Sequence, residues 1–254
     1  MRRSASRFLA ERIVVIRPLV SVFLLAVVAC ELGAVARADE NYRVSGRDSF
    51  SIGENGISSE VAYAGTQTLG VVRREHATRY VAHVTYVRRD GGASTKAVAD
   101  YVSDVSATGA PIDAANHDPD YLTVLNQPFA AKLDPATLGD LRALRGSVPF
   151  EFPSPFSGAS LHGYLRHVPS GMVGPRRSIG VTFEAAGAMR GALPDRPELL
   201  LRGTIAMHGT AFYDARTALM VSLETTVTIS GNVSNRAGKD PVTITFERSL
   251  RAVR

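Results

Sequence analysis

The chain has 254 residues, with 29 Lys or Arg, 24 Asp or Glu and a single cysteine, Cys30. Its net charge of +5 belongs mostly to residues 1–38, where six basic residues face two acidic ones, leaving 23 against 22 in residues 39–254. These numbers argue against nucleic acid as a partner, because phosphate binding needs a basic stripe, and they exclude disulfides, cysteine-ligated metals and thiolate nucleophiles from residues 39–254.

The N-terminal segment has the three parts of an export signal. Residues 1–17 carry five arginines against one glutamate, and residues 18–29 then run without a charge. That apolar stretch is shorter than the about 20 residues of a membrane-spanning helix, but it suits the core of a signal peptide. Ala36 and Ala38 each end an A-x-A site of the kind that signal peptidase cleaves. Residues 1–38 are therefore predicted to be a signal peptide, and residues 39–254 a single exported domain in the periplasm or cell envelope.

Cys30 opens a second interpretation of the same segment. Together with Val27, Val28 and Ala29 it looks like a bacterial lipobox, in which the cysteine is acylated and becomes the new N-terminus. Valine is a second-choice residue at the start of that motif, and the A-x-A sites downstream would then serve no purpose. We therefore favour soluble export, with a lipoprotein held at the membrane through Cys30 as the alternative.

Alternation of apolar and polar residues dominates from Ser49 onward and predicts antiparallel strands. Residues 242–247 alternate Val, Ile and Phe with Thr, Thr and Glu, the pattern of a strand with one buried face. Residues 203–213 and 219–230 alternate in the same way around residues 214–217, a turn of hairpin length. Further strands are predicted at about 60–73, 78–89, 121–133, 161–168 and 178–184.

Two segments depart from this alternation. Residues 134–146 begin with Asp134 and Pro135, place leucines at helical spacing and end at Gly146, which predicts a short helix. Residues 94–106 carry Val and Tyr at spacings that fit either a helix or a strand, and we favour the helix.

The predicted fold class is mainly β. Residues 148–156 interleave prolines with phenylalanines and are predicted to be an extended segment that cannot lie in the interior of a sheet. The strands have one apolar and one polar face, so each sheet covers a core on one side and meets solvent on the other. We predict a curved antiparallel sheet or half-barrel with one or two short helices, with a two-sheet β-sandwich as the alternative.

No catalytic, cofactor-binding or metal-binding residue is predicted. His83 and His208 lie in the middle of predicted strands, where a histidine is ordinarily a polar residue with a local hydrogen bond. His162 and His167 are five residues apart and so fall on opposite faces of one strand, which prevents them from sharing a metal.

Two polar motifs fall short of a known site. Residues 113–121 hold Asp113, Asp118 and Asp120, but they lack the register and the distant glutamate of a calcium-binding EF-hand loop. Gly158 lies two residues before Ser160, but Ser160 lacks a glycine two residues after it and the strand–turn–helix context of a hydrolase nucleophile.

Three arginine pairs are predicted at strand ends: Arg73-Arg74, Arg88-Arg89 and Arg176-Arg177. Charges at such positions keep sheet edges in solvent and blunt edge-to-edge association. If the fold gathered all three pairs at one edge, they would suit the anionic headgroups of lipids.

Three functions remain, and we favour the first. It is non-catalytic binding of a lipid or other hydrophobic ligand by the sheet, which requires an apolar cavity. The second is a structural or assembly partner of another envelope protein, engaged through strand edges or residues 148–156. The third is an envelope hydrolase, which requires histidine and carboxylate or serine side chains in one cleft.

Overall fold

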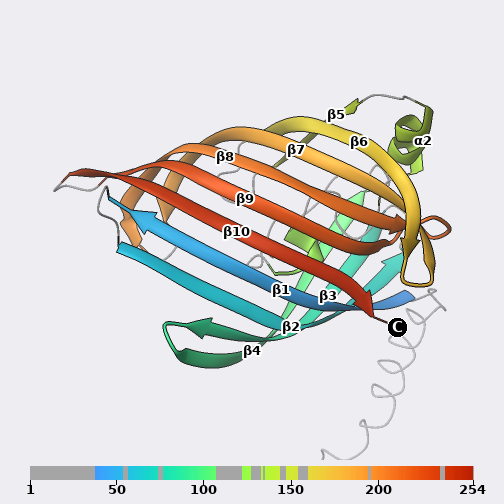
Figure 1. Ribbon diagram of the computed structural model, residues 1–254, viewed down its shortest axis with the longest axis horizontal. Helices are drawn as coiled ribbons and strands as arrows, with labels where there is room; N and C mark the ends of the chain where they lie inside the picture. The colour runs from blue at the N-terminus through green and yellow to red at the C-terminus, as the bar shows by residue number, and fades with distance from the viewer. Residues whose placement is uncertain are drawn as a thin grey trace, which may run out of the picture. The chain divides into compact units, whose positions relative to one another are not determined.

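In the computed structural model, one antiparallel sheet accounts for most of the chain (Figure 1). The described residues are 38–53, 57–73, 77–106, 122–126, 133, 135–143, 147–153, 160–193, 196–234 and 238–253. The sheet has ten strands in the order β4-β3-β2-β1-β10-β9-β8-β7-β6-β5, and it is not closed. The strands are β1 (Ala38–Ile52), β2 (Ile57–Arg73), β3 (Ala77–Asp90), β4 (Ala93–Ser106), β5 (Ser147–Pro153), β6 (Ser160–Val173), β7 (Arg176–Leu193), β8 (Arg196–Asp214), β9 (Met220–Ser234) and β10 (Lys239–Val253).

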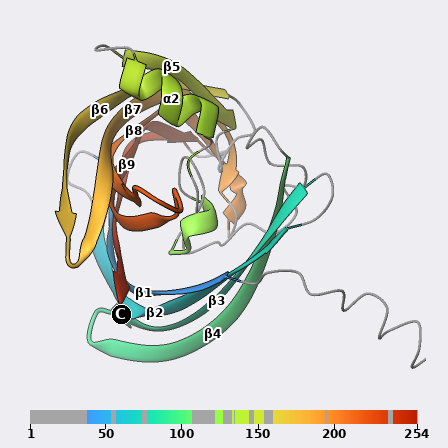
Figure 2. The same ribbon diagram turned by 90° about the vertical axis from the view of Figure 1, so that its right-hand side faces the viewer.

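The sheet curls strongly, so that it has a concave inner face and a convex outer face (Figure 2). On β10, Val242, Ile244 and Phe246 are buried, whereas Thr243 and Glu247 are exposed. The same alternation on the other strands places the core on the inner face. The predicted curved antiparallel sheet with a short helix is therefore confirmed.

The hairpin predicted around residues 214–217 is also confirmed. β8 pairs with β9 in antiparallel register, with Thr204 opposite Ser230 and His208 opposite Thr226. The carboxylate of Asp214 accepts hydrogen bonds from the backbone N–H groups of Arg216 at 2.8 Å and Thr217 at 2.9 Å, which fixes the turn.

The helix favoured for residues 94–106 is wrong, because this segment is strand β4, paired along its length with β3. Ala97, Ala99 and Tyr101 pack against the core at the two-residue period of a strand. On the opposite face, the carboxylate of Asp104 receives two hydrogen bonds from Arg79, at 2.8 and 2.6 Å. The spacing of the valines fits both a helix and a strand. The segment forms a strand because it pairs with the edge of β3.

The strand predicted at 121–133 is wrong over the part that the structure describes. Leu122 and Thr123 are irregular, and Val124–Asn126 form the short 3-10 helix η1. Leu122 and Val124 are fully buried, so the apolar run packs against the core without joining the sheet. A short apolar run looks the same whether it pairs in a ladder or fills an interior.

The helix predicted at 134–146 is present as α2 (Pro135–Ala143). Its Leu138 and Leu141 are buried and belong to the core. Figure 2 shows α2 beside β5 and β6 at one end of the curled sheet. Residues 148–153 of the proline-containing segment lie in β5, the last strand of the described sheet, which pairs with β6, so this part is outside the sheet interior as predicted. Residues 154–156 lie outside the described residues.

Strand β1 begins at Ala38, whereas the alternation of apolar and polar residues that predicts strands starts only at Ser49. Its inner face carries Tyr42 and Val44, but next along the row come Gly46 and the buried Asp48. Because a glycine and a carboxylate occupy two of the inward positions, the sequence of β1 does not show the alternation of apolar and polar residues that predicts a strand.

A search of the described residues for a helix long and apolar enough to cross a membrane finds none.

Candidate functional site

We call the concave inner face of the sheet the cup. The side chains on this face are mainly apolar and are shielded from solvent. They come from strands across its whole width, from β3 and β2 through β10 and β9 to β6. Among the most deeply buried are Leu69, Val84, Leu161, Leu165, Leu201, Ile205, Met207 and Leu250.

Parts of the segment that connects β4 to β5 pack against the cup. This cover consists, as far as it is described, of Leu122–Asn126, Leu133 and α2. Leu122, Val124 and Leu133 are at most 2% exposed, so the cover inserts apolar side chains against the cup. η1 contacts β3 and β4, whereas α2 contacts β5 and β6. The cover therefore reaches both free edges of the sheet.

The described backbone of the cover is hydrogen-bonded to the sheet at Val124 and at Leu133. The N–H of Val124 donates to the side-chain Oε1 of Gln67 on β2 at 3.2 Å. The N–H of Leu133 donates to the carbonyl of Ala218 in the β8–β9 turn, also at 3.2 Å. Burial of Leu122, Val124 and Leu133 adds to this attachment.

A buried ion pair interrupts the apolar lining of the cup. Arg248 on β10 donates from Nη1 to the Oδ1 of Asp48 on β1 at 2.5 Å. The same nitrogen donates to the backbone carbonyls of Glu247 at 2.9 Å and Arg47 at 3.3 Å. The guanidinium also lies 5.0 Å from the centre of the Tyr63 ring, within the range of a cation–π contact. Sequence reasoning missed this pair, since each residue by itself resembles an ordinary surface charge.

Two tyrosines project into the cup near the start of β1. The hydroxyl of Tyr42 donates to the carbonyl of Met220 at 2.8 Å. Tyr213 is fully buried, and its hydroxyl has no hydrogen-bond partner within the described ranges. Burial raises the pKa of both hydroxyls far above its ordinary value, so each remains protonated and able to donate. Neither tyrosine was singled out from the sequence.

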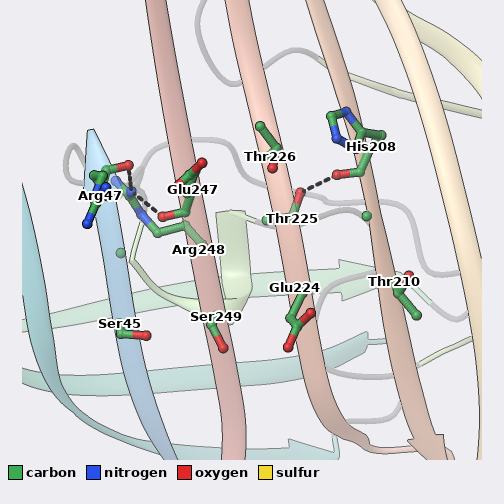
Figure 3. Close-up of a pocket in the computed structure, with 12 residues that line it drawn as sticks. Ser45, Arg47, His208, Thr210, Glu224, Thr225, Thr226, Glu247, Arg248 and Ser249 are labelled. Atoms are coloured by element: carbon green, nitrogen blue, oxygen red, sulfur yellow. Dashed lines mark hydrogen bonds between the residues drawn. The ribbon is translucent and has the colours of Figure 1, made fainter. Parts of the chain in front are cut away.

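The outer face carries a hollow of about 600 Å³ over the central strands. Figure 3 shows its polar side chains along β1, β10, β9 and β8. The lining residues are Ser45, Gly46, Arg47, His208, Gly209, Thr210, Glu224, Thr225, Thr226, Glu247, Arg248 and Ser249. A second hollow, of about 560 Å³, adjoins the β6–β7 hairpin and includes Met172 and Arg176.

The hollow of Figure 3 groups His208 with Glu224 and Glu247, the residue types that a hydrolase requires. The hydrogen bonds drawn there engage backbone carbonyls: Thr225 Oγ1 donates to the carbonyl of His208 at 3.3 Å. No hydrogen bond in the described part of the chain joins the imidazole of His208 to either carboxylate. The hollow is a solvated polar face and lacks a nucleophile hydrogen-bonded to a base.

The other histidines that the structure describes, His83, His162 and His167, lie on the surface. His83 on β3 is exposed and contacts Asp100 on β4 at 2.7 Å. His162 lies 3.7 Å from Glu151, and His167 falls on the opposite face of β6, as predicted. Among the described residues, no group of three His, Cys, Asp or Glu residues is placed to hold a metal ion.

The arginine pairs are divided between the two ends of the sheet. Arg73 ends β2 and Arg176 begins β7, at the end where β1 starts. Arg176 is tied there by a 2.6 Å ion pair with Glu40. Arg88 and Arg89 lie at the opposite end, next to the β3–β4 turn. A single basic edge built from all three pairs is therefore excluded.

Several predicted positions lie outside the described residues. These are Cys30, Ala36, Arg74 and residues 107–121, which include the aspartate cluster. Ala38 is the first residue of β1 and pairs with Val71. Ser160 is the first residue of β6.

No family model and no curated protein matches the chain. Among solved structures, the chain is similar to one titled "Lipid-protein interactions in lipovitellin", with a TM-score of 0.42 and 9% sequence identity. The match covers 87% of this chain and 25% of the other, so the chain spans about a quarter of that protein's length. A likeness of this size leaves the function to be inferred from the chain's own residues.

Proposed function

We propose that the chain is an exported envelope protein that binds a lipid or another hydrophobic ligand in the cup, without catalysis. One observation carries this proposal: in the part of the segment between β4 and β5 that the structure describes, the apolar inner face of the sheet packs against irregular chain and the short helix α2, and not against a second sheet. The described cover lacks the continuous backbone ladder by which a second sheet would hold its strands together. An apolar ligand can therefore take its place.

Exchange of the cover for a lipid chain has a small energetic cost. Burying one methylene group stabilises a complex by about 0.8 kcal/mol, whether the group belongs to a leucine or to an acyl chain. Leu138 and Leu141 of α2 occupy the interior in the covered state, and an acyl chain would bury a similar area in their place. The two free edges, β4 and β5, are not hydrogen-bonded to each other, so the sheet can open slightly to admit the ligand.

Native mass spectrometry of the processed chain, purified from its own cells, tests this function. We expect a bound lipid that is lost on organic extraction and regained on incubation with lipid extract. A chain that carries no lipid and also fails to bind a fluorescent fatty acid would overturn the proposal.

A cover variant sharpens the test. Leu141→Ala removes a buried side chain of α2 and should increase the population in which the cover has left the cup. Because apparent affinity scales with the fraction of competent molecules, we expect the fatty-acid probe to bind at least about 3-fold more tightly. Val98→Ala, at a position that is 64% exposed on β4, is the matched control and should bind as the wild type does.

The free edges favour a second candidate function, the addition of a partner's strand to β4 or β5. β5 carries Pro149, which removes one donor from its edge, and β4 carries Lys96, Asp100 and Asp104, charges of the kind that disfavour edge pairing. The mass spectrum separates the two candidates, since an assembly partner would appear as a bound polypeptide and not as a lipid.

A further inference from the structure

We propose that Gln67 and Tyr213 form a polar anchor in the cup, which hydrogen-bonds the ester carbonyl of an acylated ligand. This inference rests on the proposed function and names the chemical class of its ligand. The anchor would hold the head of the ligand, and the apolar lining of the cup would hold its acyl chain.

The first observation is that both residues are buried with hydrogen-bonding capacity left over. Gln67 is 1% exposed and Tyr213 is 0% exposed. The Nε2 of Gln67 and the hydroxyl of Tyr213 have no hydrogen-bond partner among the residues that the structure describes. Buried polar groups are nearly always hydrogen-bonded, because leaving one unsatisfied is destabilising. Such groups on an otherwise apolar wall point to a polar atom that the chain itself does not provide.

The second observation is that strand pairing places both residues at the same end of the cup. Gln67 on β2 lies opposite Tyr42 on β1. The Tyr42 side chain crosses to β9, where its hydroxyl donates to the carbonyl of Met220. Met220 in turn lies opposite Tyr213 on β8. Gln67, Tyr42, Met220 and Tyr213 are therefore successive neighbours. They place Gln67 and Tyr213 at the end of the sheet where β1 begins.

The third observation is that the cover is attached at this same end. The backbone N–H groups of Val124 and Leu133 donate to Gln67 itself and to Ala218, in the turn that follows Tyr213. The anchor therefore lies where the described cover meets the cup. A ligand head held there would leave its chain free to extend along the apolar lining.

The chemistry of the anchor selects the ligand. The Oε1 of Gln67 already accepts a hydrogen bond from Val124, so its remaining capacity is that of the amide donor. The protonated hydroxyl of Tyr213 is also a donor, and two neutral donors suit an acceptor that carries no charge. A carboxylate would have to lose its hydration without a free cation, since Arg176, which acts on Tyr42 at this end, is already paired with Glu40, and Arg248 is paired with Asp48. An ester carbonyl satisfies the anchor at lower cost.

Binding of methyl palmitate and of free palmitate at neutral pH to the processed chain tests the anchor. We expect the wild type to bind the ester more tightly than the acid. Tyr213→Phe and Gln67→Met should each weaken ester binding about 3- to 10-fold, the effect of losing one neutral hydrogen bond. The thermal unfolding midpoint of Tyr213→Phe should be unchanged or higher, because this variant removes an unsatisfied buried hydroxyl. That of Gln67→Met should be lower, because this variant also removes the acceptor of the Val124 N–H.

Tyr42→Phe is the matched control, because its hydroxyl already donates to Met220. It should lower the unfolding midpoint and leave ester affinity unchanged. The anchor is overturned if both test variants bind methyl palmitate as the wild type does, or if palmitate binds more tightly than its ester. A wild type that binds neither compound nor any other lipid refutes the proposed function itself, so the two failures are distinguishable.

Discussion

Arg248 and Asp48 form an ion pair on the inner face of the sheet, with Nη1 and Oδ1 2.5 Å apart and the two side chains 0% and 4% exposed. They lie on the neighbouring strands β10 and β1, diagonally across the pairing of Gly46 with Arg248. Two charges removed from water are tolerated only when they compensate each other and their remaining donors and acceptors are used. The pair therefore couples the last strand of the chain to the first described one.

Loss of one member of this pair should be far more damaging than loss of both. Asp48→Ala should lower the free energy of unfolding by about 3–5 kcal/mol, because it leaves the Arg248 guanidinium buried without its counter-charge. The double variant Asp48→Ala with Arg248→Met should be clearly more stable than Asp48→Ala alone. Urea denaturation of the three variants measures the coupling, and strictly additive losses would contradict it.

Gly46 should not tolerate a side chain, because Arg248 occupies the space. A Cβ at position 46 would lie 2.8 Å from the Cδ of Arg248 and 3.0 Å from the carbonyl oxygen of Glu247. Gly46→Ala should therefore cost about 1–3 kcal/mol of unfolding free energy. Gly191→Ala on β7 is the control, since a Cβ there meets nothing within 4 Å. Equal unfolding midpoints in denaturant for the two variants would refute the prediction.

The two faces of β10 should respond differently to truncation. Ile244 is 5% exposed on the inner face, so Ile244→Ala should cost about 2–5 kcal/mol. Thr243→Ala and Thr245→Ala, on the outer face, should each stay near about 1 kcal/mol or below. Chemical denaturation checks all three. If the threonine changes matched the isoleucine change, the outer face would have to be buried as well.

Asp214 should make the β8–β9 turn sensitive to acid. Partial burial raises the pKa of its carboxyl, but the backbone N–H groups of Thr217 and Arg216 and the Thr217 hydroxyl outweigh burial and lower the pKa below its ordinary value of 3.8. A carboxyl pKa that is lower in the folded than in the unfolded state stabilises the fold at pH values above the unfolded-state pKa. This stabilisation is lost as the pH falls through the folded-state pKa.

We therefore expect Asp214→Asn to be less stable than the wild type at neutral pH, with a difference that shrinks as the pH falls below about 3.8. Unfolding midpoints measured between pH 7 and pH 2 test this. A difference that grows on acidification would show that the sign is wrong.

Export and processing should follow the N-terminal segment. A reporter fused to the C-terminus and active only outside the cytoplasm should be active, because residues 1–38 have the parts of a cleavable signal. Cys30→Ala should leave the amounts of the protein in the soluble and membrane fractions unchanged, since we favour cleavage after Ala38 over lipidation. Loss of fatty-acid labelling in this variant would establish the lipoprotein interpretation instead.

Local chemistry was sufficient to predict several elements. The strict alternation of residues 242–247 appears in β10, and the turn at 214–217 joins β8 to β9, because period and turn residues act over a few positions. α2 begins at Pro135 for the same reason, since capping and helical spacing are local properties.

The tertiary structure decided the rest, because the competing local structures differ little in energy until a partner is present. Residues 94–106 became a strand when β3 offered a free edge, and Leu122 and Val124 were buried without pairing because they face the cup. The start of β1 escaped prediction because Asp48, 200 positions from its counter-charge on Arg248, has a reason to be buried only once β1 and β10 pair. The sequence by itself determined a curved sheet with one polar face, whereas the ion pair, the cover and the meeting of Gln67 with Val124 depend on contacts between distant segments.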